Sequence, residues 1–418
     1  MNIRITPSAT GGSIRAIASK SVAHRMLICA AFAKGETKIL CQDINEDIEA
    51  TARCLEAFGA RVCREGQYLS VSPVKEIEKN ALLDCGESGS TLRFVLPVAA
   101  LLGAEPSFAM KGRLPSRPLS PLREELERLG VEFSPVGSNP LTIRGRAEAC
   151  EFGIRGDVSS QFISGLMLAL AVSGRVGKIN ILGELQSAPY IDITASVIRA
   201  FGGRVEFCDN AYVVDAHEGL AVSGELFVEG DWSNAAFPLC LGALGRKSVT
   251  VTGLDRNSCQ GDKQIVEILL AMGASVEWKT DALTVYPSLL HASKIDASQI
   301  PDLVPVVSVL CAFAEGESVI FNAERLRIKE SDRLLAVSEI LNAMGAEVEE
   351  RPDGLVIRGK KRLKGGQVSS FGDHRIVMSA AVASVRCDTD VEIVGAEAVA
   401  KSYPSFFGDM ATLGMKSE

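Results

Sequence analysis

The sequence contains no C-x-x-C pair among its eleven cysteines, and it has only four histidines. Closely spaced cysteines and histidines are the usual signature of a zinc site. Their absence argues against zinc, and no other metal-ligand spacing is present. We therefore expect no metal and no cofactor. We interpret the cysteines as reduced packing residues of a cytoplasmic protein.

The chain also lacks an excess of positive charge, because 44 Lys and Arg face 52 Asp and Glu, which gives a formal net charge of −8. This balance argues against nucleic acid as a main partner. Apolar stretches such as "FISGLMLALAVSG" are too short to cross a membrane, and the first residues show no apolar signal-peptide core. We expect a soluble monomer, without nucleic-acid or membrane partners, that holds any anion in a small local site.

What the sequence does contain is a repeated unit, in a chain long enough for two domains of about 200 residues each. A helix end, a glycine turn and a strand recur six times, as in "AFGARV" and "AMGAEVE". The turn glycines are Gly59, Gly130, Gly202, Gly273, Gly345 and Gly414, at intervals of 71, 72, 71, 72 and 69 residues. Glycine suits this position because helices often end in a left-handed residue.

A second landmark recurs in register with the glycine turns, where small or polar residues run into an apolar helix. The six landmarks begin at residues 18, 88, 157, 230, 300 and 371. Together with the β-rich segments between them, they predict units of the form strand, helix, strand, helix, strand, strand. The last unit lacks its closing strand, and the N-terminal "NIRITP" has the pattern to supply it.

The repeats thus predict an α/β fold with two similar domains, each of three βαβαββ units related by pseudo-three-fold symmetry. Residues 1–12 plus 229–418 would form one domain and residues 13–228 the other. The two crossings would form a hinge, and ligands commonly bind at such domain interfaces. A repeat array with a binding face and no chemistry is the alternative.

Each polar landmark lies where a helix begins, and helix N-termini attract anions through unpaired N–H groups and the helix dipole. The candidate ligands there are Lys20, Ser21, Arg25, Gly89, Ser90, Arg93, Ser159, Ser160, Gln161, Asp302, His374 and Arg375. Further cations are Lys111, Arg113, Arg117, Lys329, Arg333 and Lys401. Ser and Asp are also ordinary helix caps. Cations are less ordinary at a helix start, so we infer that an anion of higher charge offsets their cost.

The stretch "RLRIKESDRLLAV", residues 325–337, concentrates charge ahead of an apolar helix. Lys329 and Arg333 are four residues apart and on a helix would share one face, with Glu330 about 100° away. Salt-bridged surface residues are the alternative. A carboxylate crowded by cations stays ionised, so Glu330 or Asp302 acts as a base only if it is partly buried or coupled to proton movement.

An ordered set of motifs between residues 4 and 408 carries a family resemblance. The motifs are "SKS" followed by Arg25, "SGSTLR", "RPL", "VSSQF", "PYIDIT", "GDWSNAAF", "IPD", "KESDR", "DHR" and "KSYP". In this order they resemble the 5-enolpyruvylshikimate-3-phosphate synthase family of the enolpyruvyl transferases. The resemblance implies two domains of three βαβαββ units that close over the substrates. It also implies transfer of the enolpyruvyl group of phosphoenolpyruvate to the 5-hydroxyl of shikimate 3-phosphate, in the pathway to aromatic amino acids.

The resemblance also implies roles for individual residues. Shikimate 3-phosphate would be held by Lys20, Ser21, Arg25, Ser159, Ser160, Gln161, Ser187, Asp302 and Lys329. Phosphoenolpyruvate would contact Lys20, Gly89, Arg117, Gln161, Arg333, Arg375 and Lys401. The implied catalytic residues are Asp302, which takes the 5-hydroxyl proton, Glu330, which protonates the methylene carbon, and Lys20. Addition would give a tetrahedral ketal, and loss of phosphate would restore the enol ether. Gly89 matches the glycine of members that glyphosate inhibits.

Two positions depart from the family pattern. Many members read N-A-G-T-A-M-R where this chain has "ESGSTLR", so Glu87 replaces an Asn, and Arg325 replaces an Asn found in some members. One alternative is the sister UDP-N-acetylglucosamine enolpyruvyl transferase, whose reactive Cys is missing from the loop "SFAMKGRLPSRP". The other alternative is a non-catalytic anion-binding protein of the same fold.

Overall fold

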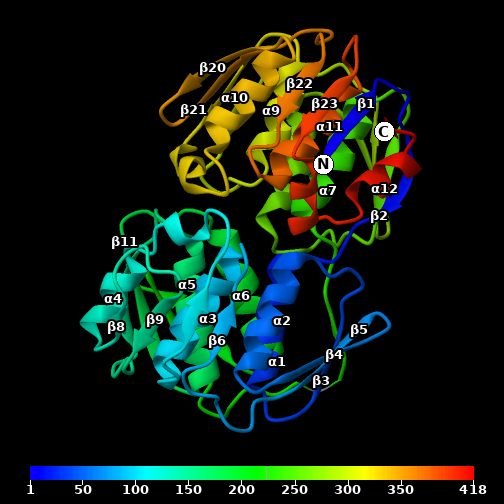
Figure 1. The fold of residues 1–418 in the computed structure, drawn as a ribbon. Coiled ribbons are helices and arrows are strands. Elements are labelled where there is room, and N and C mark those ends of the chain that lie inside the picture. Colours follow the sequence, from blue (N-terminus) through cyan, green and yellow to red (C-terminus); the bar gives the residue numbers. More distant parts are fainter. Residues whose placement is uncertain (223) are drawn as a thin grey trace. The chain divides into compact units, whose positions relative to one another are not determined.

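A computed structural model of the chain describes residues 1–222 and 224–418, and these residues divide into two units (Figure 1). Met1–Ile17 and Glu229–Glu418 form one unit, here called the terminal unit. Ala18–Val228 form the other, here called the central unit. The chain therefore crosses between units twice, immediately before residues 18 and 229.

Among the residues that the structure describes, the central unit contains six α-helices and one 3-10 helix. The helices are α1 (Lys20–Ala31), α2 (Glu46–Ala57), α3 (Gly89–Leu102), η1 (Leu114–Ser116), α4 (Leu122–Arg128), α5 (Ser160–Ser173) and α6 (Ala188–Ala200). The strands are β3 (Thr37–Leu40), β4 (Arg61–Glu65), β5 (Tyr68–Ser72), β6 (Leu82–Asp84), β7 (Ser107–Ala109), β8 (Glu132–Phe133), β9 (Leu141–Arg144), β10 (Glu151–Arg155), β11 (Gly177–Leu182), β12 (Arg204–Cys208), β13 (Ala211–Asp215) and β14 (Leu226–Phe227).

The terminal unit contains a matching set of elements. The helices are α7 (Trp232–Leu244), η2 (Gly261–Gln264), α8 (Ile265–Ala271), α9 (Val304–Ala312), η3 (Glu324–Ile328), α10 (Arg333–Ala343), α11 (His374–Ser384), η4 (Ala396–Lys401) and α12 (Phe406–Thr412). The strands are β1 (Asn2–Thr6), β2 (Gly12–Arg15), β15 (Val249–Thr252), β16 (Ser275–Lys279), β17 (Ala282–Tyr286), β18 (Lys294–Asp296), β19 (Glu317–Phe321), β20 (Glu347–Arg351), β21 (Gly354–Arg358), β22 (Gly366–Ser369), β23 (Val391–Val394) and β24 (Lys416–Ser417).

Within residues 1–222 and 224–418, each unit has three four-stranded sheets with one repeated topology. The orders are β14-β3-β5-β4, β6-β7-β9-β8 and β10-β11-β13-β12 in the central unit, and β16-β17-β15-β2, β18-β19-β21-β20 and β22-β23-β1-β24 in the terminal unit. In β6-β7-β9-β8, for example, β6 is parallel to β7, and the later pairs are antiparallel. The helix α3 makes the parallel crossover, as such connections require. The predicted βαβαββ units are therefore confirmed.

The N-terminal strand completes the last repeat, as its missing strand predicted. β1 pairs antiparallel with β23, where Ile3 lies opposite Ile393, and with β24. The first strands of two other repeats are exchanged. β2 pairs in parallel with β15, and β14 pairs in parallel with β3. Residues 13–17 therefore belong to the terminal unit, whereas the sequence placed them in the other domain, because strand pairing rather than local pattern decides this boundary.

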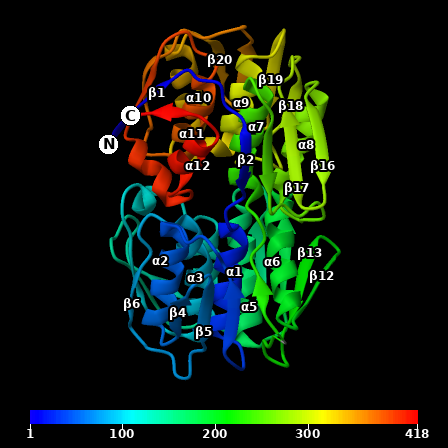
Figure 2. The same ribbon diagram turned by 90° about the vertical axis from the view of Figure 1, so that its right-hand side faces the viewer.

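Two kinds of helix follow from two hydrophobic patterns. The helix after the first strand of each repeat is mostly apolar and buried on nearly all sides, and from Phe162 to Ala171 every residue of α5 is buried. The second helix of a repeat has a polar face, as in α2, where Glu46, Glu49 and Arg53 are not buried. Apolar helices thus fill each core and the sheets cover them (Figure 2). Truncation at a fully buried site such as Leu166 would cost about 2 to 5 kcal/mol.

The six turn glycines all have the left-handed backbone that their position predicted. The φ angles are 105° at Gly59, 95° at Gly130, 84° at Gly202, 91° at Gly273, 92° at Gly345 and 92° at Gly414. At Gly59 an added Cβ would also lie 2.8 Å from the carbonyl oxygen of Glu76. The repeat period in the sequence is therefore the period of a real turn.

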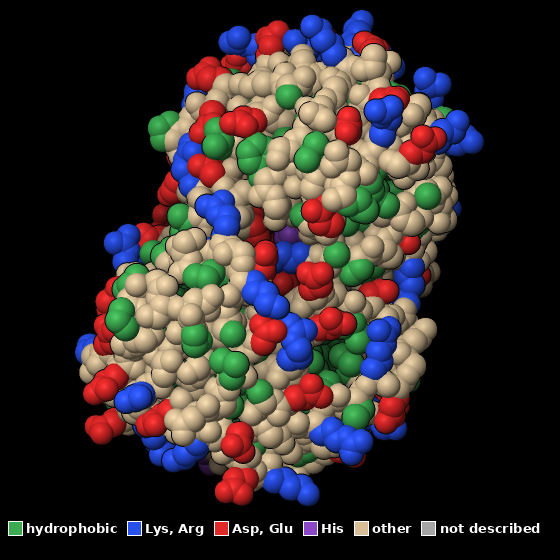
Figure 3. Space-filling model, in the orientation of Figure 1, with side chains coloured by type: hydrophobic (Ala, Val, Ile, Leu, Met, Phe, Trp, Pro, Cys, Tyr) green, Lys and Arg blue, Asp and Glu red, His purple; other side chains and the backbone are tan. Residues whose placement is uncertain are grey.

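The distribution of surface charge is relevant to the prediction that nucleic acid is not a partner. On the face that Figure 3 shows, Lys and Arg side chains lie among Asp and Glu side chains. Within residues 1–222 and 224–418, every helix is too short or too polar to cross a membrane. Cys208 and Cys259 are exposed, so these two cysteines are not the packing residues that the sequence suggested.

Candidate active site

The most concentrated charge in the terminal unit surrounds Asp302, in the turn before α9. Arg333 Nη1 donates to Asp302 Oδ1 at 2.8 Å, and Arg375 Nη2 donates to Oδ2 at 2.9 Å. Lys329 Nζ lies 3.8 Å from Oδ1. The sequence placed Asp302 at a helix start. In the structure its carboxylate makes ion pairs there and does not cap α9, because the N-cap residue of that helix is Leu303.

The surroundings of Asp302 fix its ionisation. Burial favours the neutral acid, but the charges of Arg375, Lys329 and Arg333 outweigh burial and hold the pKa of Asp302 well below its usual range. Its side chain remains 19% exposed, so the carboxylate is still reachable. Asp302 is thus an ionised acceptor among cations.

Arg333 is held from three sides. Its side chain is 1% exposed, and Nη2 donates to Glu330 Oε2 at 2.9 Å. Its Nε donates to Asp373 Oδ2 at 2.8 Å, and Ser331 Oγ donates to the same oxygen at 3.0 Å. Burial opposes the charge, but the nearby carboxylates raise the pKa of Arg333 above its ordinary value. A guanidinium satisfied by three carboxylates keeps one orientation.

The stretch before α10 corrects one expectation. Lys329 and Arg333 do not share a helix face, because Lys329 follows the 3-10 helix η3 and α10 begins only at Arg333. Asp332 is the N-cap of α10, with its Oδ1 accepting from Leu335 N at 3.2 Å, so the helix does not extend back to Lys329. The two cations nevertheless converge on Asp302. A bend brings them together, not helical spacing.

Two further predicted ligands lie in the same unit. Arg375, in the first turn of α11, is 1% exposed, and its Nη1 also donates to the backbone carbonyl of Asp302 at 3.1 Å. Lys401 ends η4, which packs against α11, and is 8% exposed.

Lys329, the third cation near Asp302, has a shifted pKa. Burial lowers this pKa to about 8, whereas the charge of Asp302 acts to raise it.

In the central unit, the starts of α3 and α5 meet through polar side chains. Gln161 Oε1 accepts from Arg93 Nη1 at 2.8 Å, and Gln161 Nε2 donates to Ser90 Oγ at 2.9 Å. Gly89 lies against two guanidinium groups, because an added Cβ would be 2.7 Å from Arg117 Nη1 and 3.1 Å from Arg93 Nη1. The predicted residues Gly89, Arg117 and Gln161 are therefore brought together.

Arg25 is buried where α1, α5 and α6 meet. Its Nε donates to Thr194 Oγ1 at 2.6 Å, its Nη1 to the Ser21 carbonyl at 2.6 Å, and its Nη2 to the Tyr190 carbonyl at 2.9 Å. The guanidinium also stacks over Phe94, 4.7 Å from the ring centroid. Arg25 thus positions the starts of α1 and α6, whatever ligand it contacts.

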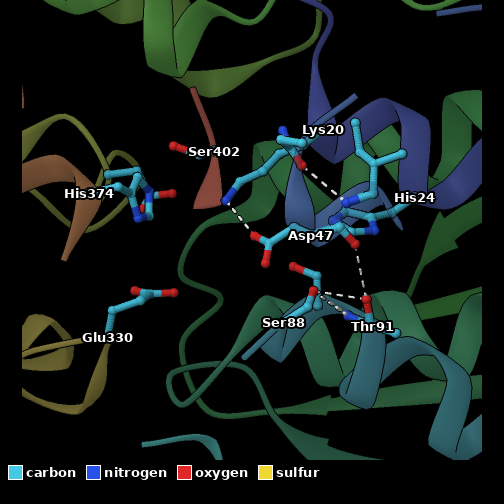
Figure 4. A network of polar contacts seen from close by, with 12 residues as sticks. Lys20, His24, Asp47, Ser88, Thr91, Glu330, His374 and Ser402 are labelled. Atoms are coloured by element: carbon cyan, nitrogen blue, oxygen red, sulfur yellow. Dashed lines mark hydrogen bonds and ion pairs between the residues drawn. The ribbon is translucent and has the colours of Figure 1, made fainter. Parts of the chain in front are cut away.

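The remaining predicted residues of the central unit lie at helix starts. Lys20 begins α1, and its Nζ is 2.8 Å from Asp47 Oδ2 (Figure 4). Ser159 caps α5 by accepting from Gln161 N at 3.3 Å, and Ser160 is the first residue of that helix. Ser187 precedes α6 with φ 55° and ψ 37°, a backbone that serine rarely adopts.

The two departures from the family pattern occupy different settings. Arg325 Nη2 donates to the Ser298 carbonyl at 2.9 Å, so it ties η3 to the loop after β18. The Glu87 carboxylate lies against Gly112, where an added Cβ would overlap Oε1. Gly112 has φ 53° and follows Lys111, whose N–H donates to the Gly86 carbonyl at 2.7 Å. Glu87 thus packs against the loop that carries Arg117.

Two site carboxylates, Asp47 and Asp373, were not among the residues that the sequence indicated. Cations at the starts of α1, α10 and α11 were attributed to a bound anion, but Asp47, Asp302 and Asp373 supply part of the compensating charge. For Asp373 a signal existed, because it stands directly before α11 at a capping position. Asp47 had none, since an acidic residue in the first turn of a helix is common. Among the described residues, no cluster has the composition of a metal site.

Six βαβαββ repeats, with cations and carboxylates gathered at several of their helix starts, define an α/β protein with the charges that a small anionic ligand needs. The chain belongs to the EPSP synthase (3-phosphoshikimate 1-carboxyvinyltransferase) family, whose model matches residues 5–410. A 3-phosphoshikimate 1-carboxyvinyltransferase of Clostridium kluyveri is 42% identical over 414 residues, covering 99% of this chain and 97% of the relative. One of Clostridium perfringens is 42% identical over 420 residues, covering 98% and 97%.

Solved structures show the same fold at lower identity. EPSP synthase from Acinetobacter baumannii superposes with a TM-score of 0.82 at 24% identity, covering 100% of this chain and 99% of that one. The enolpyruvyl transferase NikO from Streptomyces tendae superposes with a TM-score of 0.79 at 17% identity, covering 100% and 98%. These two likenesses concern architecture.

Proposed function

We propose that the protein transfers the enolpyruvyl group of phosphoenolpyruvate to the 5-hydroxyl of shikimate 3-phosphate and releases phosphate. The observation that carries the proposal is the Asp302 cluster, in which Lys329, Arg333 and Arg375 converge on one reachable carboxylate beside Glu330. A substrate pair rich in phosphate and carboxylate needs such cations. The proton transfers need the two carboxylates.

Binding follows from the charges. Phosphoenolpyruvate would be bound by Arg333, Arg375 and Lys401 of the terminal unit and by Lys20, Gly89, Arg117 and Gln161 of the central unit. Shikimate 3-phosphate would be bound by Lys20, Ser21, Arg25, Ser159, Ser160, Gln161 and Ser187, together with Asp302 and Lys329.

Asp302 acts as the base in this proposal, although its pKa is held low in the free protein. An anionic substrate that attracts Arg333 and Arg375 reduces their stabilisation of the Asp302 carboxylate, which raises its proton affinity. Asp302 then accepts the 5-hydroxyl proton as that oxygen attacks C2 of phosphoenolpyruvate. Glu330 delivers a proton to C3, which gives the tetrahedral ketal. The Glu330 carboxylate then takes a proton back from C3, phosphate leaves with the proton held by Asp302, and the double bond is restored.

The test is phosphate release with both substrates present, with NMR identification of the enol ether product. Omitting either substrate should abolish release. UDP-N-acetylglucosamine in place of shikimate 3-phosphate tests the sister activity and should give no product. Binding of both substrates without any release would instead indicate a non-catalytic protein of this fold.

We also propose that the protein is a cytoplasmic monomer and needs no cofactor. Cysteines without disulfides and a fold with its own core in each unit support it. Light scattering after gel filtration at assay concentration would check the oligomeric state, and a dimer would contradict this part alone.

A further inference from the structure

His24 is a buried imidazole in α1 that no predicted role uses. It is 1% exposed and lies one turn beyond Lys20 on the same helix. Its Nδ1 is 2.7 Å from Thr51 Oγ1 of α2, and its ring meets Phe94 of α3 edge to face, with centroids 6.3 Å apart. A histidine in such a place has a definite partner on one ring nitrogen.

The contact continues as a chain of hydroxyl groups, and Figure 4 shows its last link, from Thr91 to Ser88. Thr51 Oγ1 is 2.7 Å from Thr91 Oγ1, which donates to Ser88 Oγ at 2.8 Å. Both threonines are fully buried and Ser88 is 1% exposed. Ser88 also caps α3 by accepting from Thr91 N at 3.3 Å. The chain therefore runs from the second turn of α1, through α2, to the first residues of α3.

The order of donation follows from counting protons. Because a hydroxyl carries one proton, a Thr91 that donates to Ser88 accepts from Thr51, and Thr51 accepts from Nδ1–H of His24. Nε2 of His24 is buried and has no hydrogen-bond partner among the described residues. A second proton would leave an unpaired donor there. Burial accordingly lowers the pKa of His24 to about 3, with Lys20 and Arg25 acting in the same direction and Asp47 against them.

Both ends of the chain adjoin proposed substrate ligands. On α1, His24 is four residues from Lys20 and adjacent to Arg25, and on α3, Ser88 directly precedes Gly89. Along the way, the Thr91 hydroxyl lies 3.4 Å from the backbone carbonyl of Asp47, whose carboxylate pairs with Lys20. A shift of α1 relative to α3 would therefore displace Lys20 from Gly89 and Arg93.

We propose that His24 is a positioning residue, which through Thr51 and Thr91 fixes the start of α1, with Lys20, against the start of α3, with Gly89. The inference rests on the proposed function, because its readout is turnover. His24 itself touches neither substrate. It acts by keeping the groups that bind phosphoenolpyruvate at fixed positions relative to one another.

The experiment compares two replacements of equal size. The amide of His24→Asn places a polar atom where Nδ1 stands and keeps the bond to Thr51, whereas His24→Leu cannot. We expect His24→Leu to lower kcat/KM for phosphoenolpyruvate roughly 10- to 100-fold, the effect of a small misplacement of catalytic groups. His24→Asn should stay within about threefold of the parent, a difference too small to mark a lost contact.

A double-mutant cycle tests the route. Thr51→Val should repeat the loss seen in His24→Leu, and the double variant should be no worse than either single variant, because both break one chain. The matched control is Thr142→Val, which removes a hydroxyl from the Ser107–Thr142 pair at 2.9 Å in the same unit and should leave kcat/KM unchanged. If His24→Leu fails to fold, the His24→Asn and Thr51→Val arms still decide.

Several results would overturn the proposal. These are parent-like kcat/KM in His24→Leu or Thr51→Val, an equal defect in His24→Asn, or additive losses in the double variant. Loss of an ionisation near neutral pH in the His24→Asn rate profile would show that His24 itself titrates during turnover. Absence of phosphate release by the parent would defeat the proposed function, whereas an active parent with an unaffected His24→Leu would defeat only the role of His24.

Discussion

Arg375 donates two hydrogen bonds to Asp302, one from Nη2 to the side-chain Oδ2 at 2.9 Å and one from Nη1 to the backbone carbonyl at 3.1 Å. One arginine therefore fixes both the position of this residue and the direction of its carboxylate. Because the two residues lie 73 positions apart, the start of α9 is tied to the start of α11 at the proposed reaction centre.

Asp302→Asn should keep the fold and lose most turnover. Asn retains an acceptor oxygen for Arg375 and the backbone contact, but it cannot take a proton from the substrate hydroxyl. General-base catalysis contributes typically ~10² to 10⁴-fold, and kcat should fall by that range. Phosphate release and calorimetric binding of shikimate 3-phosphate measure the two effects. A variant with near-parental kcat would show that Asp302 is not the base.

Turnover should decline at alkaline pH because of Lys329. Its pKa is lowered to about 8, chiefly by burial, so it is charged below that pH and loses its charge as pH rises through that value. Since kcat/KM reports the free enzyme, kcat/KM for shikimate 3-phosphate should fall above about pH 8. Lys329→Arg stays charged and should move this limb to higher pH.

The control for this pH effect is Lys360→Arg, which alters a lysine paired with Glu347 at 3.1 Å on the surface and should leave the profile in place. An alkaline limb that persists unchanged in Lys329→Arg would assign the ionisation to another group.

Asp373→Asn should destabilise the terminal unit. Asp373 is fully buried and accepts from Arg333, from Ser331 and from the Arg375 backbone N–H. Asn would remove one of the three carboxylates that pair with the buried Arg333, and its amide N–H groups would face donors. Breaking a buried pair in this way costs about 3 to 5 kcal/mol, measurable by urea unfolding.

The comparison for Asp373 is Glu317→Gln, which breaks an exposed pair with Arg358 of similar length, 2.9 Å, and should change the unfolding free energy little. Equal losses in the two variants would mean that burial does not set the strength of these pairs.

Gly89→Ala should weaken glyphosate more than phosphoenolpyruvate. The new methyl group would lie 2.7 Å from Arg117 Nη1 and 3.1 Å from Arg93 Nη1, so these flexible side chains must shift. Glyphosate is expected to extend into the space beside Gly89, where the methyl group would overlap it too, and such an overlap costs roughly 1 to 3 kcal/mol, or about a tenfold to hundredfold loss of affinity. The KM for phosphoenolpyruvate should rise less, because it is the shorter ligand. Equal losses in the inhibition constant and KM would contradict a selective clash.

The sequence by itself determined the repeat and the places where helices begin and end. Glycine turns such as Gly202 and capping residues such as Ser88 act within a few residues of the chain, so their spacing is visible without a structure. The same local signals located most residues of the candidate site, and the order of the motifs indicated the family. The hydrophobic pattern also separated buried helices from amphipathic ones.

Only the tertiary structure decided which partners these elements take. β2 and β14 each precede the first helix of a repeat, and their exchange between repeats depends on pairing with β15 and β3, which lie far away in the sequence. Likewise, Asp302 meets Arg333 across 31 residues and Arg333 meets Asp373 across 40. The ionisation of a site carboxylate depends on burial and on the distances to such neighbours, and a linear pattern carries neither quantity.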